Sequence, residues 1–251
     1  MNGQDIPARV ASAAGAIETL RRRAPRIHCL TNTVAQAFTA NVLLACGATP
    51  SMTVASDEVL SFTDRADGVL INLGTLDEDR KKAMRLSAAR CRETARPFVV
   101  DPVKCDISAQ RRAFATELLP FRPAAIRMNA DEASSLEASL EGEMPCRVVT
   151  GRTDRILCGE TCLSVANGHP WLTQITAAGC AEGALIAALM PVAGDPVLAA
   201  LAALLWFNIA AEEAAARTLE KAAGPGTFQP VLIDCLHAMD AARIMEKARV
   251  T

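Results

Sequence analysis

The sequence predicts an α/β fold in which a mostly parallel β-sheet lies between two layers of helices. Short runs of Val, Ile and Leu are separated by longer helical patterns through the first 151 residues. Each apolar run is continuous, which is typical of parallel strands that are covered on both faces. After residue 151 the pattern changes to a short hairpin and then to a mostly helical segment.

The expected elements alternate along the chain. Helices are expected at residues 8–24, 35–46, 77–95, 108–119 and 130–141. The apolar runs expected as strands are RIHCLT (26–31), GVLINLG (68–74), PFVVDPV (97–103), AAIRMN (124–129) and RVVTG (147–151). RILCGETCLSVANG (155–168) is expected to form an antiparallel pair, and 180–250 to be mostly helical. Gly47 is expected to end the second helix, because glycine accepts the left-handed conformation common at helix ends.

Length and composition indicate one large core. The chain has 251 residues, of which 51% are hydrophobic, and no linker or repeat divides it, so a single domain over 1–251 is expected. A net charge of -2 without a basic block argues against nucleic acid and anionic membranes as partners. The apolar stretch at 197–211 is too short, and too closely followed by Glu212 and Glu213, to be expected to span a bilayer. The partner is therefore expected to be a small molecule.

The nine cysteines have irregular spacing and form no CxxC pair. This pattern suggests neither a structural zinc site nor a disulfide scaffold. An odd number of cysteines suits a reducing compartment, and no targeting segment is recognised near the N-terminus. We therefore expect a cytoplasmic protein.

Polar residues gather where the predicted strands end, which is where ligands bind in such folds. They are His28, Asn32, Asn72, Thr75, Asp101, Arg127, Asn129, Glu132, Thr150 and Gly151. Asp101 and Glu132 are hard oxygen ligands without His or Cys companions, which suits Mg²⁺ better than zinc. Taken singly, Asp101 is also explained as a turn residue before a proline, and Glu132 as a carboxylate in a first helical turn. Together the residues favour a metal-nucleotide site.

The segment ITAAGC (175–180) places small residues at the expected start of a helix. Such a turn presents backbone N–H groups to an anion, as phosphoryl transfer requires. Cys180 would lie in the first turn, where a thiol pKa tends to fall, with its sulfur facing the hydroxyl to be phosphorylated. Alternatively, Ala177, Ala178 and Gly179 only permit close helix packing and Cys180 is a small core residue. The spacing alone leaves both interpretations open.

Seven motifs in order, between about residues 20 and 240, resemble the hydroxyethylthiazole kinases of thiamin salvage, which are ribokinase-like enzymes. They are HCLTNTVAQAFTANVLLACGATPSM (28–52), LINLGTL (70–76), DPV (101–103), PAAIRMNADE (123–132), VVTG (148–151), AAGC (177–180) and AGPGTF (223–228). The resemblance implies a ribokinase-like three-layer sandwich. It also implies phosphorylation of 4-methyl-5-(2-hydroxyethyl)thiazole that depends on ATP and Mg²⁺.

On the substrate side, the resemblance implies that Met52 packs on the thiazole. Members of the family are trimers, so Gly74 and Thr75 of a neighbouring subunit are expected to close the pocket. The resemblance assigns Gly179 to the anion-hole turn. Cys180 lies where many ribokinase relatives keep a catalytic aspartate, so positioning of the hydroxyl is expected to matter more than removal of its proton by a strong base.

On the nucleotide side, the resemblance makes Asp101 and Glu132 the metal-side carboxylates. It makes Arg127 and Thr150 contacts to the phosphates of ATP. These four assignments agree with the chemistry of the side chains, but their roles come from the resemblance.

The departures from the family pattern lie on this nucleotide side. The family turn Thr-Gly-Thr-Gly-Cys is here Thr176–Cys180 with two alanines, and alanine resists the positive φ that glycine accepts. Met128 replaces a glycine, and a flexible side chain there is expected to fill space left for ATP. Glu182 replaces a leucine and would repel phosphate if it faced inward. After DPV, Lys104 and Asp106 replace small residues.

The connection LEASLEGEMPC (136–146) is also shorter than the family's, which normally has a further helical segment at this point. We therefore expect an exposed part of one sheet face and leave open whether the trimer persists. A catalytically weak or inactive homologue that binds thiazole or nucleotide is one alternative function. A kinase with another phosphoryl donor, or for another small alcohol, is a second.

Overall fold

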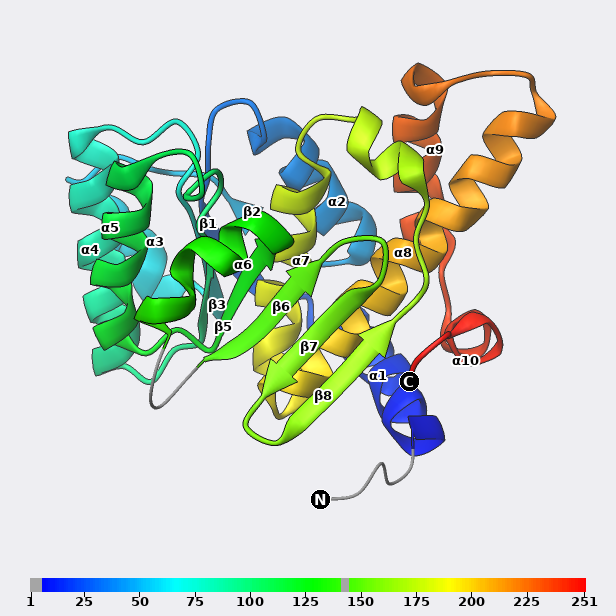
Figure 1. Ribbon diagram of the computed structural model, residues 1–251, viewed down its shortest axis with the longest axis horizontal. Coiled ribbons are helices and arrows are strands. Elements are labelled where there is room, and N and C mark those ends of the chain that lie inside the picture. The colour runs from blue at the N-terminus through cyan, green and yellow to red at the C-terminus, as the bar shows by residue number, and fades with distance from the viewer. Residues whose placement is uncertain (1–5, 141–144) are drawn as a thin grey trace.

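The computed structural model describes residues 6–140 and 145–251, and its elements follow the predicted order (Figure 1). The α-helices are α1 (Ile6–Arg23), α2 (Gln36–Cys46), α3 (Val59–Arg65), α4 (Glu78–Glu93), α5 (Ala109–Leu118), α6 (Ala130–Leu136), α7 (Ala178–Ala193), α8 (Pro196–Glu220), α9 (Pro225–Ala238) and α10 (Ala241–Lys247). The strands are β1 (Arg26–Leu30), β2 (Thr49–Ser51), β3 (Gly68–Asn72), β4 (Phe98–Asp101), β5 (Ala125–Asn129), β6 (Cys146–Thr150), β7 (Asp154–Cys158) and β8 (Thr161–Val165).

The strands form one sheet in the order β2-β1-β3-β4-β5-β6-β7-β8. Strands β1 to β6 are parallel, while β7 and β8 add an antiparallel hairpin at one edge. The chain first moves outward from β1 to β2 and then returns to β3 on the other side of β1. Ligands bind at such a reversal of direction, beyond the carboxyl ends of the strands.

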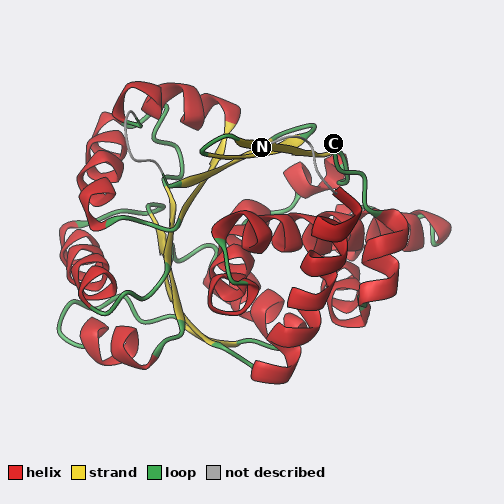
Figure 2. Cartoon of the chain, turned by 90° about the horizontal axis from the view of Figure 1, so that it is seen from below, coloured by secondary structure: helices red, strands yellow, loops and turns green. Residues whose placement is uncertain are grey.

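Helices cover both faces of the sheet, which Figure 2 shows edge-on between its two helical layers. Helices α3 to α6 pack on one face, and α1, α2 and α7 to α10 form the layer on the other face. Two clusters of buried apolar residues fill these interfaces, and we call them the α4-side and α7-side clusters. Alternate residues of one strand enter different clusters: Leu70 joins the α7-side cluster, whereas Val69 and Ile71 join the α4-side cluster. The predicted three-layer arrangement is confirmed.

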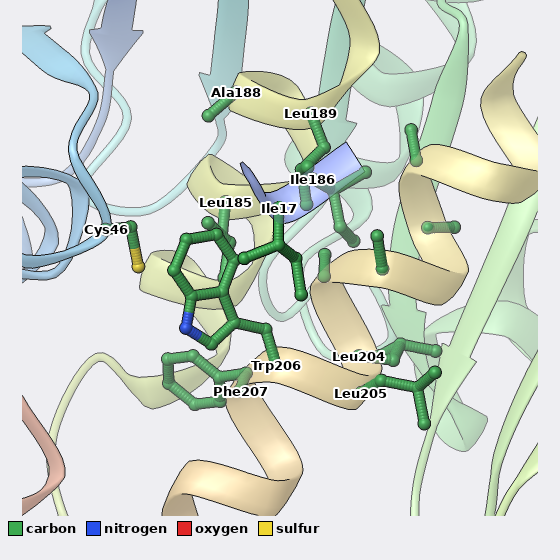
Figure 3. Packing of buried hydrophobic residues seen from close by; sticks show 14 of the residues in the cluster. Ile17, Cys46, Leu185, Ile186, Ala188, Leu189, Leu204, Leu205, Trp206 and Phe207 are labelled. Carbon is green, nitrogen blue, oxygen red and sulfur yellow. The ribbon is translucent and has the colours of Figure 1, made fainter. Parts of the chain in front are cut away.

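Helices α7 and α8 form the centre of the α7-side cluster, where Trp206 and Phe207 are buried beside Leu185 and Ile17 (Figure 3). The indole N–H of Trp206 donates to the carbonyl of Leu236 at 2.9 Å, so this large side chain leaves no unsatisfied donor.

Helix α8 has 25 residues and is long and apolar enough to cross a membrane by composition alone. The apolar stretch 197–211 is part of this longer helix, which continues past Glu212 and Glu213 to Glu220. Its most apolar window is 83% buried inside the protein, which identifies α8 as a core helix.

Most predicted element ends agree with the structure within a few residues. Gly47 ends α2 with a φ of 93°, as expected for a left-handed helix terminus. The predicted helix at 130–141 is shorter, because a 3₁₀ turn (Glu137–Ser139) follows α6. The shortened connection includes residues 141–144, which lie outside the described residues. The short elements β2 and α3 were not predicted.

Candidate active site

Four polar side chains at the carboxyl edge of the sheet share the α7 side. They are Asn72, Asp101, Arg127 and Thr150, on β3, β4, β5 and β6. Each follows a residue of the α7-side cluster by two positions, so the two-residue period of a strand turns it toward α7. The structure therefore brings together four residues that the sequence analysis placed at strand ends.

Side-chain amides link the start of α7 to Asp101. Nδ2 of Asn32 donates to Sγ of Cys180 at 3.4 Å and to Oδ1 of Asn72 at 3.0 Å. Nδ2 of Asn72 in turn donates to Oδ2 of Asp101 at 2.9 Å. We call Cys180, Asn32, Asn72 and Asp101 the amide chain. Because asparagine both donates and accepts, this chain fixes the thiol and the carboxylate relative to each other.

Asp101 is nearly fully buried, yet its Oδ1 atom has no hydrogen-bond partner among the described residues. Burial raises its pKa to about 7, Arg127 opposes the rise, and Glu132 adds to it. A buried carboxylate oxygen without a partner is costly unless a ligand, proton or cation satisfies it. Oδ1 of Asp101 is therefore available to a bound group.

Glu132 is buried after β5 and serves the local fold. Its two carboxylate oxygens accept from the backbone N–H groups of Lys104 at 2.7 Å and Asn129 at 2.8 Å. The side chain of Asn129 accepts from the N–H of Glu132, which completes a capping box at the start of α6. In the described residues no group of three His, Cys, Asp or Glu side chains could hold a metal. A divalent ion here would need phosphate or water ligands besides these carboxylates.

The Arg127 guanidinium lies between β6 and α7. Its Nη2 donates to Oγ1 of Thr150 at 2.9 Å, and its Nε donates to Oε2 of Glu182 at 3.2 Å. Burial alone would lower the pKa of Arg127, but the carboxylates of Glu182, Asp101 and Glu132 raise it above its usual value, so the group keeps its charge. Glu182 does face inward, the condition under which it was expected to repel phosphate, but there it is paired with the Arg127 cation.

Helix α7 begins with a strained residue. Ala177 is the N-cap of α7 and has a φ of 70°, so an alanine occupies the left-handed conformation where the family pattern has glycine. No side chain caps this helix start. Non-glycine residues in this conformation cost about 1–2 kcal/mol each, and such strain is frequent at functional sites.

Replacing Ala177 by glycine is expected to raise the free energy of unfolding by about 1 kcal/mol, because glycine relieves this strain. Ala178 supplies a matched control, since it is the first residue within α7. Glycine at position 178 should lower the free energy of unfolding by up to about 1 kcal/mol through its poorer helix propensity. Urea unfolding of both variants measures the difference, and destabilisation by Ala177→Gly would show that the turn is not strained.

Cys180 lies in the first turn of α7, as predicted. The expectation of a lowered thiol pKa is wrong, because burial raises the pKa of Cys180 to about 11 and the Asp101 carboxylate adds to the rise. Burial outweighs the helix terminus here. The thiol stays protonated near neutral pH, which leaves it a role in packing and hydrogen bonding rather than as a base.

Gly179 is packed against Arg127. A Cβ atom added to Gly179 would lie 2.5–2.8 Å from three atoms of the Arg127 guanidinium. Glycine at this position therefore lets the cation approach the backbone of the first turn of α7. The small-residue segment makes room for a charged side chain and not only for helix packing.

The three residues expected on the substrate side follow two different strands. Met52 follows β2 and is half-buried against the α7-side cluster. Gly74 follows β3, and its N–H donates to Oδ1 of Asn72 at 3.1 Å. A Cβ on Gly74 would lie 2.8 Å from the Asn32 side chain, so the amide chain requires glycine here. Thr75 is exposed, with a φ of 46°.

Two residues lie elsewhere than expected. Met128 is fully buried in the α4-side cluster, so the prediction that it fills space for ATP is wrong. Strand alternation explains this, because Arg127 on the same strand already faces α7. His28 lies within β1 rather than at its end and stacks on Phe62 of α3. Burial lowers the pKa of His28 to about 4, so this ring stays neutral.

Asp154 and Asn208 support the site and were not predicted from the sequence. Oδ1 of Asp154 accepts from the N–H of Gly151 at 2.8 Å, and Oδ2 accepts from Nδ2 of Asn208 at 2.7 Å. Together they fix the turn that follows Thr150. A signal was present, because Asn208 is the single polar residue in the apolar stretch 197–211.

Comparison with known proteins gives a consistent result. The model of the hydroxyethylthiazole kinase family matches residues 17–146 and 140–242. A probable hydroxyethylthiazole kinase of Agrobacterium fabrum is 40% identical over 98% of this chain and 97% of its own. A hydroxyethylthiazole kinase of Granulibacter bethesdensis is 38% identical over 92% of this chain and 91% of its own.

Solved structures agree. The structure of a hydroxyethylthiazole kinase from Pyrococcus horikoshii has a TM-score of 0.88 and 33% identity, and covers 95% of this chain and 98% of that chain. A pyridoxal kinase from Staphylococcus aureus in complex with pyridoxal has a TM-score of 0.55 and 12% identity, and covers 74% of this chain and 87% of that chain. At that identity the second likeness shows a shared ribokinase-like fold alone.

Proposed function

Because this chain belongs to the hydroxyethylthiazole kinase family, we propose that it transfers the γ-phosphoryl group of ATP to the hydroxyl of 4-methyl-5-(2-hydroxyethyl)thiazole. The chain is a kinase, and ATP is its co-substrate. The product is the phosphate ester of the thiazole alcohol, which serves thiamin salvage.

One observation supports this activity most strongly. The amide chain ends at Cys180 on α7, and the Arg127 guanidinium packs against the adjacent residue Gly179. A site for an acceptor hydroxyl and a site for transferred phosphate thus meet at one helix start. Phosphoryl transfer depends mainly on such positioning and on stabilisation of charge.

The residues at this helix start have separate proposed roles in binding phosphate and in orienting the substrate hydroxyl. The first turn of α7 has no side-chain cap, and we propose that its backbone N–H groups bind a phosphate beside the Arg127 cation. Thr150 holds Arg127 at the end of β6 and is proposed as a second contact to ATP. Cys180, fixed by Asn32, orients the substrate hydroxyl.

Mg²⁺ is proposed to accompany ATP on the side of Asp101 and Glu132. Support comes from Oδ1 of Asp101, which is buried and has no partner among the described residues. Mg²⁺ is usually held by one or two carboxylates plus substrate phosphates and water, which these two residues match. When bound, the ion would neutralise charge on the transferring phosphates.

The proposed substrate pocket uses two copies of the chain. Met52 of one copy would pack on the thiazole, and Gly74 and Thr75 of a neighbour would close the pocket. Support comes from the sheet order, because β1 separates β2, which precedes Met52, from β3, which precedes Gly74. Large apolar side chains are also exposed on segments flanking β2, including Val34 and Leu44.

A homotrimer is the expected assembly. Sedimentation equilibrium should then give a mass three times the 26.5 kDa of one chain. A monomer mass at assay concentration, together with full activity, would contradict the shared pocket.

The remaining features suit a single cytoplasmic kinase domain. All nine cysteines are free, and six of them are buried, which fits a compartment that keeps thiols reduced. Neither nucleic acid nor a membrane is proposed as a partner.

An ADP-release assay with ATP and Mg²⁺ tests the substrate. Hydroxyethylthiazole should stimulate ADP release, and pyridoxal, an alcohol of similar size, should stimulate it far less. The reverse preference would indicate a kinase for another alcohol. Thiazole affinity without any ADP release would instead indicate a binding protein.

A further inference from the structure

Glu182 is the one charged residue of α7, whose sequence is AGCAEGALIAALMPVA. It is 4% exposed. Placing a carboxylate in this apolar helix costs free energy unless a partner compensates it. The contacts of Glu182 therefore identify the group that compensates its charge.

The partner of Glu182 is Arg127, and the contact is specific. Oε2 of Glu182 accepts from Nε at 3.2 Å, while Oγ1 of Thr150 accepts from Nη2 at 2.9 Å. The two side chains are 6% and 15% exposed. Two acceptors on different nitrogens fix the plane of a guanidinium, which a single bond does not.

The remaining nitrogen of Arg127 is left for a ligand. Among the described residues, none accepts a hydrogen bond from Nη1. Nη1 is also the guanidinium atom nearest to the position of a Cβ on Gly179, at 2.5 Å. Glu182 and Thr150, which we call the clamp, thus direct the unused donors of Arg127 to the first turn of α7.

Glu182 is one of several carboxylates that act on Arg127. Asp101 and Glu132 also act on the guanidinium through their charges, while Asp154 acts on Glu182. Carboxylates therefore outnumber the cation in this part of the site. Direct contact with Nε is what Glu182 adds.

We propose that Glu182 is a positioning residue for the phosphoryl donor. Its carboxylate holds the Nε edge of Arg127, so that Nη1 faces the phosphate bound at the start of α7. This proposal rests on the proposed function, because it assigns Arg127 to ATP.

Glu182→Leu and Glu182→Gln separate positioning from structure. Leucine removes the acceptor, and glutamine keeps an amide oxygen that still accepts from Nε. We expect Glu182→Leu to lower kcat/KM for ATP roughly ten- to a hundredfold, the cost of a small misplacement of a catalytic group. KM for the thiazole should stay within about twofold of wild type, because the amide chain is untouched. Glu182→Gln should recover most of the loss.

Glu213→Gln is the matched control, since Glu213 is a partly buried partner of Arg217, Arg243 and Lys247 outside the site. It should leave kcat/KM for ATP unchanged. A higher or unchanged kcat/KM for ATP in Glu182→Leu would overturn the proposal, and a higher value would show that the carboxylate competes with phosphate. Equal loss in the leucine and glutamine variants would also overturn it.

A nucleotide titration separates this proposal from the proposed function. If the wild-type protein phosphorylates no thiazole, the proposed function fails, and calorimetric titration with a non-hydrolysable ATP analogue and Mg²⁺ still ranks the variants. The order wild type, Glu182→Gln, Glu182→Leu in falling affinity supports the clamp. Equal affinities refute it. If the leucine variant does not fold, the glutamine variant alone is titrated. Affinity for the ATP analogue close to that of wild type supports the clamp, and loss of that affinity refutes it.

Discussion

Replacing Asp101 by asparagine is expected to lower kcat for thiazole phosphorylation by on the order of 10²–10³, the usual cost of removing one preorganised electrostatic group. Asparagine keeps the shape of the side chain and an oxygen that accepts from Asn72. It removes the charge that the unpartnered Oδ1 atom presents to the proposed Mg²⁺ and ATP. The loss should therefore appear in turnover and in the use of Mg²⁺ with ATP.

Thiazole binding supplies the comparison for Asp101→Asn. Titration calorimetry should show thiazole affinity near that of wild type. Asp67→Asn is the control, because Asp67 pairs with Arg26 at the amino end of the sheet, away from the site. Equal losses of thiazole affinity and turnover in Asp101→Asn would show that Asp101 is structural.

Gly179→Ala should lower kcat by about 10²-fold with little loss of stability. The new Cβ would overlap the Arg127 guanidinium at 2.5–2.8 Å and push this flexible end aside. Because a side chain rather than backbone must move, and because alanine favours a helix, the fold should tolerate the change. Steady-state kinetics and thermal unfolding, measured together, test this.

Gly15→Ala is the control for the added methyl group. Gly15 lies in α1, where a Cβ would meet nothing within 4 Å. This variant should gain up to about 1 kcal/mol in stability and keep wild-type kinetics. Unaltered turnover in Gly179→Ala would mean that the observed position of Arg127 does not matter for transfer.

Much of the fold could be predicted because its strands are buried on both faces. Runs such as GVLINLG and PFVVDPV are continuous, and each is bounded by helical patterns. Strand β2 escaped prediction because it is the three-residue edge strand TPS, which has no apolar run. Helix α3, with seven residues, is too short for a clear periodicity.

Only those residues of the candidate site that lie at strand ends could be predicted from the sequence. Asp101, Arg127 and Thr150 end their strands or nearly so, and parallel strands bring those ends together. The partner of Arg127 is 55 residues away in the chain, on a helix whose rotation about its axis the sequence does not give. The side of Met128 was predictable, because neighbouring residues of a strand face opposite sides of the sheet and Arg127 was already assigned to the ligand side.

The most direct test of the account is ³¹P NMR of the wild-type protein incubated with ATP, Mg²⁺ and hydroxyethylthiazole. We predict that ADP and a new phosphate monoester of the thiazole alcohol appear in equal amounts, and that neither appears when the thiazole is omitted. Unconsumed ATP would contradict the account. So would ADP with inorganic phosphate and unchanged thiazole alcohol.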